Sequence, residues 1–269
     1  GAHFLNLNYE WACTSAVTAG AKARQAGAGP AAPPRLLRVL DWSLEGLGAA
    51  VVAARFAAPA GPWINLTWPG FVGCIQATAP GRFAACFNQA PMREHLRFLP
   101  VGWAAGRLRV WRSQGLPPAH LLRQVFESCR DYAAARAALT ETPIALPAIF
   151  ILAGARAGEG CIIERLEHAA FVHEGPEVVA NAWLTAGLGG RSRRDDNAER
   201  RTQLSTALAK GQAGADFAWL RPPALNQTTR LALVAEPAAG RLAALGIEAG
   251  QPATQILHME TLQSEGARP

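Results

Sequence analysis

Cys13 is the residue of this 269-residue chain whose neighbourhood best suits covalent chemistry. The small residue Ala12 precedes it, and the hydroxyl residues Thr14 and Ser15 follow it. If the bond between Ala12 and Cys13 were cut, the new α-amine, with an ordinary pKa of about 8, would be a general base for the thiol beside it. The same thiol can make that cut through an N-to-S acyl shift. We therefore predict self-cleavage between Ala12 and Cys13 and a nucleophile at Cys13; a buried structural cysteine is the alternative.

Two charged residues interrupt the apolar segment 36–42, whose composition predicts a buried strand. Arg38 would lower the pKa of the Cys13 thiol, and Asp41 would accept hydrogen bonds from the terminal ammonium of Cys13. In a regular strand these two side chains point to opposite faces, so a bulge or the strand's end is needed for both to reach one site. A structural ion pair is the alternative.

Two asparagines and one arginine complete the candidate site. Asn88 closes an apolar strand, and Asn181 follows the apolar run 178–180. A side-chain amide is a suitable oxyanion donor, worth about 3–4 kcal/mol of transition-state stabilisation, although a buried amide needs hydrogen bonds whatever its role. Arg200 lies in the charged segment 195–202, where charge pattern alone indicates a solvated helix face.

The composition bounds the remaining chemistry. Half of the residues are hydrophobic and 17% are charged, so the chain can bury a sizeable core. The net charge is +6, but the densest basic cluster, 191–194, is followed directly by Asp195 and Asp196, so we expect no nucleic-acid partner. The five cysteines lack CxxC spacing and the six histidines are dispersed, so we expect no metal site. No apolar run reaches the roughly 20 residues of a membrane span.

The hydrophobic pattern predicts strands, then helices, then strands, in an α+β layered domain. Helical spacing covers 116–139, in two pieces, and 195–210. Short strand-like segments are predicted at 13–18, 36–42, 49–57, 63–67, 71–77, 82–88, 145–153, 161–165, 168–173, 231–235 and 241–245.

Taken together, the segments that carry these residues resemble the acid ceramidase and N-acylethanolamine acid amidase family, within the wider choloylglycine hydrolase and penicillin V acylase group. The similarity extends in order over nearly the whole chain. Its segments are 5–15, around the proposed cleavage point; 38–41, Arg-Val-Leu-Asp; 145–165, with its Gly-Glu-Gly-Cys turn; 195–202; and 223–234.

The resemblance implies a four-layer αββα N-terminal-nucleophile hydrolase fold, with two stacked antiparallel sheets flanked by helices. It implies that 1–12 ends an N-terminal propeptide or α-subunit segment and that 13–269 is the hydrolase domain. No metal or organic cofactor is implied. The catalytic group that it implies comprises Cys13 as nucleophile, Arg38 and Asp41 beside it, Asn88 and Asn181 near the oxyanion, and Arg200 in the supporting charge network.

The expected reaction is hydrolysis of a small-molecule linear N-acyl amide through a Cys13 thioester. Trp63, Trp68 and Phe71 are candidates to line a pocket for an apolar acyl group, although core packing explains these aromatic residues equally well. Two alternatives stay open: an acyltransferase that uses the same thioester, and an unprocessed zymogen or non-catalytic relative, in which the base is absent.

Expectations about partners and location are less specific. A homo-oligomer, or association with the cleaved N-terminal segment, is compatible with the resemblance. The abundance of Ala and Gly favours a bacterial cytoplasmic protein. An exported or lysosome-like location is the alternative, because the chain as given begins with Gly1 rather than Met.

Overall fold

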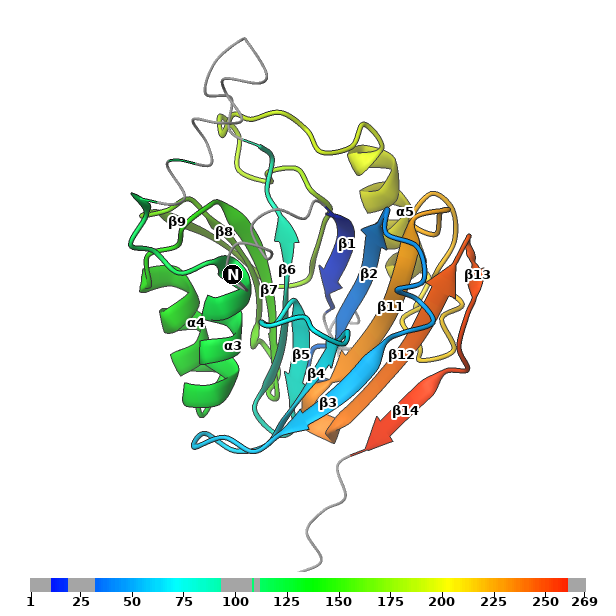
Figure 1. Ribbon diagram of the computed structural model, residues 1–269, viewed down its shortest axis with the longest axis horizontal. Helices are drawn as coiled ribbons and strands as arrows, with labels where there is room; N and C mark the ends of the chain where they lie inside the picture. Colours follow the sequence, from blue (N-terminus) through cyan, green and yellow to red (C-terminus); the bar gives the residue numbers. More distant parts are fainter. Residues whose placement is uncertain (1–10, 19–31, 93–107, 109–111, 261–269) are drawn as a thin grey trace, which may run out of the picture.

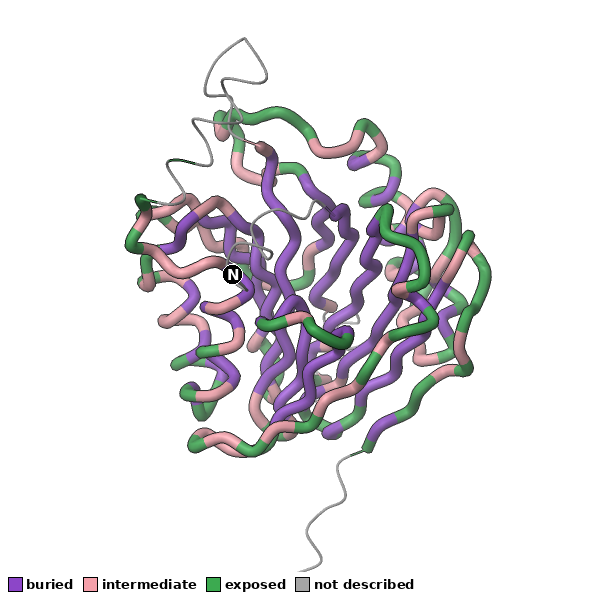
Figure 2. The backbone as a smooth tube through the Cα atoms, in the orientation of Figure 1, coloured by how far each residue is buried: buried purple, intermediate pink, exposed green. Residues whose placement is uncertain are grey.

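Two antiparallel sheets stacked face to face form the centre of the molecule (Figure 1). The computed structural model describes residues 11–18, 32–92, 108 and 112–260. Within these residues each sheet has seven strands. The central strands of both sheets are buried along their length, as Figure 2 shows.

Sheet A contains the candidate nucleophile. Two of its pairings join strands that are far apart along the chain, β10 with β1 and β2 with β11, so its core is assembled from both ends of the sequence. Its order is β10 (Glu177–Val179), β1 (Trp11–Val17), β2 (Leu36–Trp42), β11 (Thr229–Glu236) and β12 (Arg241–Glu248), with β13 (Gln251–Pro252) and β14 (Leu257–Glu260) both paired to β12.

Sheet B is a meander in which each strand pairs with the next one along the chain. Its strands are β3 (Val52–Phe56), β4 (Trp63–Thr67), β5 (Gln76–Ala79), β6 (Phe83–Gln89), β7 (Ala148–Gly154), β8 (Gly160–Arg165) and β9 (Ala170–Glu174). Glycines with positive φ lie in three of its shorter connections, Gly70 between β4 and β5, Gly81 between β5 and β6, and Gly158 between β7 and β8. The connection from β6 to β7 is longer, and its described part contains two helices.

Helices cover the outer faces of both sheets. α3 (Pro118–Ser128) and α4 (Tyr132–Glu141) lie against sheet B, and α5 (Asn197–Ala209) lies against sheet A (Figure 1). α3 begins at a proline, whose missing N–H costs nothing at a helix start, and Asp131 caps α4 by accepting a hydrogen bond from the Ala134 amide. Within the described residues, no helix is both long and apolar enough to cross a membrane.

The core has two parts that correspond to the layers. One part fills the space between the sheets and beneath α3 and α4; it includes Cys13 and Leu40. The other lies between sheet A and α5; it includes Leu37 and Leu204. The four-layer αββα arrangement expected from the resemblance is therefore confirmed.

Most predicted elements agree with the structure, and the exceptions have physical reasons. The strand prediction for 71–77 is wrong, because the chain turns at Gly73 (φ +134°) and pairs only from Gln76 onward. β1 begins at Trp11 rather than at Cys13, so the proposed cleavage point lies inside a continuous strand. The three short strands β10, β13 and β14 were not predicted, since two to four residues carry no readable alternation.

Candidate active site

Cys13 lies in the third position of β1, with its side chain directed toward sheet B. It is fully buried, and its Sγ accepts a hydrogen bond from Nη2 of Arg38 at 3.0 Å. Arg38 comes from the adjacent strand β2, where it stands opposite Ser15 in the antiparallel register. Residues two apart on a strand share a face, so pairing Ser15 with Arg38 places the guanidinium beside the Cys13 thiol.

The Arg38 guanidinium is held by sheet B. Its Nη1 donates to the carbonyl of Phe87 at 2.9 Å and to Oδ1 of Asn88 at 3.2 Å. Asn88 Oδ1 also accepts from the Ser15 hydroxyl at 2.8 Å. Among the described residues no carboxylate lies within ion-pair distance of Arg38, so its charge is available to a thiolate at Cys13. A buried cation without a carboxylate is costly, which makes this position a candidate for chemistry.

The thiol is nevertheless protonated while the chain is intact. Burial raises the pKa of Cys13 to about 12, and the lowering effects of Arg38 and Arg200 do not offset it. A thiolate is the nucleophilic form of cysteine. The uncleaved chain therefore has the geometry of a nucleophile without the base that would activate it.

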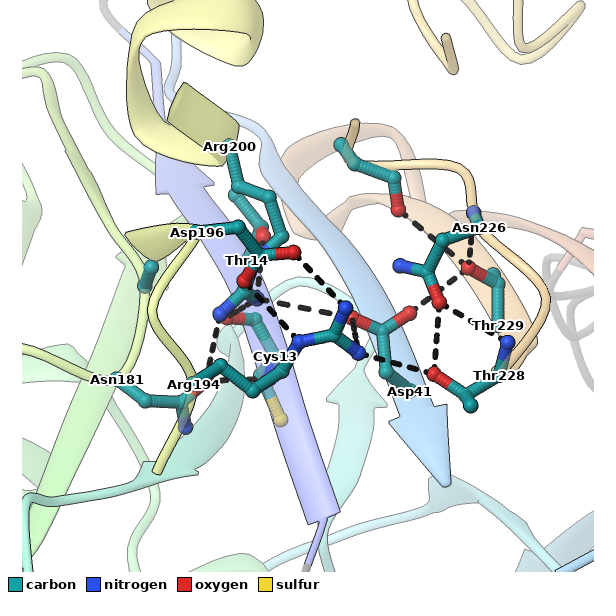
Figure 3. Close-up of polar contacts among 12 residues, drawn as sticks. Cys13, Thr14, Asp41, Asn181, Arg194, Asp196, Arg200, Asn226, Thr228 and Thr229 are labelled. Atoms are coloured by element: carbon teal, nitrogen blue, oxygen red, sulfur yellow. Dashed lines mark hydrogen bonds and ion pairs between the residues drawn. The ribbon is translucent and has the colours of Figure 1, made fainter. Parts of the chain in front are cut away.

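Two residues hold the peptide groups on either side of the Cys13 Cα (Figure 3). Its backbone N–H donates to Oδ1 of Asn181 at 2.7 Å, and its carbonyl accepts from Nη1 of Arg200 at 2.8 Å. Asn181 directly follows the Val178–Ala180 run beside β1, and Arg200 belongs to the first turn of α5. Asn181 would thus face the amine that cleavage before Cys13 releases.

Asp41 approaches β1 from the face opposite to Arg38, toward α5. Its Oδ1 accepts from the Thr229 hydroxyl at 2.8 Å, and its Oδ2 lies 3.6 Å from Nη1 of Arg200 (Figure 3). In the strand register Asp41 stands opposite Ala12, the residue before the proposed cleavage point. Burial raises the pKa of Asp41, with Arg200 the largest opposing influence.

The two candidate oxyanion donors are occupied in the intact chain. Nδ2 of Asn88 donates to the carbonyls of Val179 and Ala180, at 3.3 and 2.9 Å. Nδ2 of Asn181 donates to the carbonyl of Gln89 at 2.8 Å. Both amides therefore fasten the segment after β10 to the end of β6, and their service to an oxyanion stays a prediction.

Arg200 is fully buried, so the interpretation of its segment as a solvated helix face is wrong at this position. Its Nε donates to Oδ1 of Asp196 at 2.9 Å, and its Nη2 donates to Oδ1 of Asn197 at 2.7 Å. Arg194 is a second cation beside this group: it donates two hydrogen bonds to the Asp196 carboxylate and one to the Thr228 hydroxyl. Helical spacing points Asp196 and Arg200 the same way, and tertiary packing then encloses the guanidinium.

The structure brings together two of the three predicted acyl-pocket residues. Trp68 and Phe71 contact Trp42, with ring centroids 5.7 and 6.4 Å from it. Trp63 lies elsewhere, stacked between Phe56 and the α3 residue Phe126.

The aromatic group near the candidate nucleophile has a further member, Trp11, which lies just before the proposed cleavage point. The Trp11 ring lies 5.1 Å from that of Trp42 and 5.8 Å from that of Phe87. We call Trp11, Trp42, Trp68, Phe71 and Phe87 the aromatic cluster.

Three residues of this region were not predicted from the sequence: Trp42, Thr229 and Asn197. Trp42 ends the predicted strand 36–42 directly after Asp41, which was a usable signal. Thr229 reaches Asp41 because a β-bulge after it shifts the pairing of β11 with β2, and a single sequence does not reveal a bulge. Asn197 stands in a charged run and resembled a surface residue.

These features define a class. Two stacked antiparallel sheets between layers of helices are the arrangement of the N-terminal-nucleophile hydrolase fold. In this chain a cysteine lies near the start of β1 within that arrangement. No family model matches the chain. Acid ceramidase of Macaca fascicularis is 34% identical over 101 residues, 37% of this chain, and the human protein of that name aligns equally well. The chain spans 24% of the length of these curated relatives.

Solved structures share the fold over most of the chain. The Caenorhabditis elegans N-acylethanolamine-hydrolyzing acid amidase ortholog superposes with a TM-score of 0.62, 18% identity, and coverage of 84% of this chain and 93% of that one. Penicillin V acylase from Agrobacterium tumefaciens superposes with a TM-score of 0.51 and 15% identity, and the match covers 92% of this chain and 86% of that one. The conjugated bile acid hydrolase of Clostridium perfringens superposes with a TM-score of 0.51 and 9% identity, and the match covers 91% of this chain and 92% of that one. The expected resemblance and fold class are confirmed.

Proposed function

We propose that this chain is the precursor of a cysteine amidohydrolase that cleaves itself before Cys13 and then hydrolyses a linear N-acyl amide. The observation that carries the proposal is the 3.0 Å contact between the Cys13 thiol and the buried Arg38 guanidinium. The acid ceramidase and acid amidase relatives support amide chemistry at this position.

The first reaction is the chain's own cleavage. The Cys13 sulfur attacks the carbonyl carbon of Ala12, the C–N bond breaks, and Ala12 becomes a thioester on the sulfur while the Cys13 nitrogen takes up a proton. Water then hydrolyses the thioester, which frees the thiol and releases the segment ending at Ala12. Asn181 holds the nitrogen that must leave, at 2.7 Å, so the leaving group is fixed during the shift.

The second reaction uses the groups that cleavage creates. The free amine of Cys13 takes the thiol proton, and Arg38 stabilises the thiolate. The thiolate attacks the substrate carbonyl, the ammonium returns its proton to the leaving amine, and water resolves the acyl thioester. Asp41, which stands opposite Ala12 in the register, would face the ammonium from the α5 side. Asn88 or Asn181 would donate to the oxyanion once released from its present carbonyl partner.

The aromatic cluster indicates an apolar acyl group. Trp11 fills the space between Trp42 and Phe87 in the uncleaved chain, and it belongs to the segment that the proposed cleavage detaches. Departure of an indole would leave a cavity lined by aromatic rings beside the nucleophile. Rings of this kind bind acyl chains better than they bind charged groups.

Mass spectrometry and a substrate panel test the proposal. The active protein should contain a chain whose N-terminus is Cys13, and Cys13→Ala should neither be cleaved nor hydrolyse any N-acyl amide in a series of graded acyl length. Full amidase activity of Cys13→Ala would refute the mechanism. An intact, inactive wild-type chain would identify a non-catalytic relative, and transfer of the acyl group to added amine in preference to water would identify an acyltransferase.

A further inference from the structure

Asn197, the first residue of α5, makes four hydrogen bonds at the edge of the candidate site. Its Oδ1 accepts from the backbone N–H of Asn181 at 3.0 Å and from Nη2 of Arg200 at 2.7 Å. Its Nδ2 donates to the Ser192 hydroxyl at 2.7 Å and to the Arg194 carbonyl at 2.6 Å. The residue is 8% exposed, so these bonds form largely out of water.

The two groups that share Asn197 Oδ1 are the groups that hold Cys13. Asn181 accepts the Cys13 N–H, and Arg200 donates to the Cys13 carbonyl. One side-chain oxygen therefore fixes the separation between the residue that faces the nitrogen of the nucleophile and the residue that faces its carbonyl.

The hydrogen bond between Asn181 and Arg200 shows what Asn197 limits. Nη2 of Arg200 donates a long hydrogen bond of 3.4 Å to Oδ1 of Asn181, the oxygen that accepts from Cys13, and a short one of 2.7 Å to Oδ1 of Asn197. Without the acceptor at Asn197, that guanidinium nitrogen would move closer to Asn181 Oδ1 to satisfy its buried N–H. The guanidinium would then compete with Cys13 for the same acceptor.

We propose that Asn197 is a positioning residue for the reaction at Cys13: its Oδ1 takes the short hydrogen bond from Arg200 Nη2, which keeps that nitrogen from displacing the Cys13 nitrogen at Asn181 Oδ1. This inference rests on the proposed function, in which that nitrogen becomes the general base. A misdirected amine would slow proton transfer without altering the aromatic cluster, so the effect belongs to kcat rather than to KM.

Two substitutions separate the acceptor from the rest of the side chain. Asn197→Ala removes all four hydrogen bonds, whereas Asn197→Asp keeps an acceptor for Asn181 and Arg200 and loses only the donated bonds. Ser192→Ala is the matched control, because it removes one Nδ2 partner and leaves Oδ1 untouched. A stability loss shared by the Ala and Asp variants is expected and does not bear on the inference.

Steady-state kinetics on an N-acyl amide provide the first measurement. We expect Asn197→Ala to lower kcat about 30-fold with KM changed less than about 3-fold, and Asn197→Asp and Ser192→Ala to stay within about 3-fold of wild type. Equal losses in the Ala and Asp variants, or an unchanged kcat in Asn197→Ala, would overturn the role of Oδ1.

Amide hydrogen exchange provides a second measurement that needs no activity. In the uncleaved Cys13→Ala background, Asn197→Ala should speed exchange of the amides of residues 13 and 181 about 10-fold and leave those of β7 unchanged. The residue-181 amide loses its acceptor, and the residue-13 amide then competes with Arg200 for Asn181 Oδ1. Asn197→Asp should retain protection of both amides. Faster exchange in Asn197→Asp, or unchanged exchange in Asn197→Ala, overturns the inference. If the wild-type protein hydrolyses no substrate, the proposed function fails, and exchange alone decides the role of Asn197.

Discussion

Arg38 and Asp41 reach the candidate nucleophile from opposite faces of sheet A. Their spacing of three residues on β2 forbids a shared face, and the structure keeps that rule: Arg38 contacts the Cys13 sulfur from the side of sheet B, while Asp41 pairs with Arg200 on the side of α5. A bulge or the strand's end, which was expected to be needed for both side chains to reach one site, is therefore not required for both to lie around Cys13. Because sheet B covers one face of β1 and α5 covers the other, charged side chains from both layers can lie around one residue of this strand.

The pH dependence of Cys13 alkylation should differ between cleaved and uncleaved chains. Burial raises the pKa of the thiol from 9.0 to about 12 in the uncleaved chain, and a raised pKa means that the neutral thiol persists to higher pH. The iodoacetamide rate of uncleaved molecules should therefore still be climbing at pH 10. Cleaved molecules should react at lower pH, because the free amine accepts the proton.

Intact-mass spectrometry resolves the two forms in one sample, so each is an internal control for the other. A rate that levels off near pH 9 in the uncleaved form would show that burial does not govern the thiol.

Replacing Arg38 should affect the reaction far more than the fold. Arg38→Lys keeps a positive charge but cannot reach the sulfur and hold Phe87 and Asn88 at the same time. We expect kcat/KM to fall about 100-fold and its pH optimum to move upward, because the thiolate loses stabilisation. The matched control is Arg35→Lys, because Arg35 is half-exposed and pairs with Glu236. This variant should leave kcat/KM unchanged; an equal loss in it would indicate a general structural effect.

Residue chemistry was predictable from the sequence where the type of residue limits its roles, and unpredictable where packing decides. A cysteine that follows a small residue, and two charged residues in an apolar segment, can be recognised from the sequence alone. Whether Trp63 or Trp42 lies beside the candidate nucleophile depends on which face of which sheet each occupies. Trp63 packs beneath α3, and no local pattern distinguished it from Trp68.

At the scale of elements, long apolar strands were predicted well because two covered faces leave a continuous hydrophobic signal. β2 and β4 agree with their predicted limits. The helix at 195–210 was also predicted, but its buried face was not, since Arg200 and Asn197 supply that face with polar groups. An element that buries charge for a site does not show the amphipathic pattern from which burial is normally inferred.

The loop between β2 and β3 depends on Gly48. A Cβ there would lie 1.9 Å from the carbonyl oxygen of Ile247 on β12, and the Gly48 amide donates to Glu248 at 2.6 Å. The same loop offers the Leu47 carbonyl to Nε1 of Trp68 at 2.7 Å. Gly48→Ala should therefore lower the free energy of unfolding by about 3 kcal/mol or more, measured in urea.

The control for this prediction is Gly189→Ala, where a Cβ meets nothing within 4 Å. That variant should stay within about 0.5 kcal/mol of wild type. A Gly48→Ala protein as stable as Gly189→Ala would mean that the loop can leave β12 without cost.

At the scale of the molecule, the fold class followed from a resemblance carried by segments at both ends of the chain. The topology explains why both ends are needed: β1 and β2 come from the first 42 residues, and β11, which pairs with β2 in sheet A, begins at Thr229. Strand and helix content alone predicted only an α+β layered domain. The stacking of the sheets became predictable when the resemblance supplied it.

Trp11 joins the two sheets at the end where the candidate nucleophile lies. It is 4% exposed, and its ring contacts Trp42 in sheet A and Phe87 in sheet B. In the uncleaved Cys13→Ala background, Trp11→Ala should lower the free energy of unfolding by about 3–5 kcal/mol, the usual cost of truncating a buried aromatic residue. Leu44→Ala, at a residue 50% exposed and two positions after Trp42, is the control and should change it by less than about 0.5 kcal/mol.

Cleavage before Cys13 would turn this covalently attached contact into one that can dissociate. The cleaved wild-type protein should consequently unfold at lower urea concentration than the Cys13→Ala precursor, and added N-acyl amide with a long acyl chain should restore part of the difference by filling the space that Trp11 leaves. Urea titrations of both forms, with and without the amide, measure this. A cleaved protein as stable as its precursor and indifferent to the amide would show that Trp11 remains in place after cleavage and that the acyl group binds elsewhere.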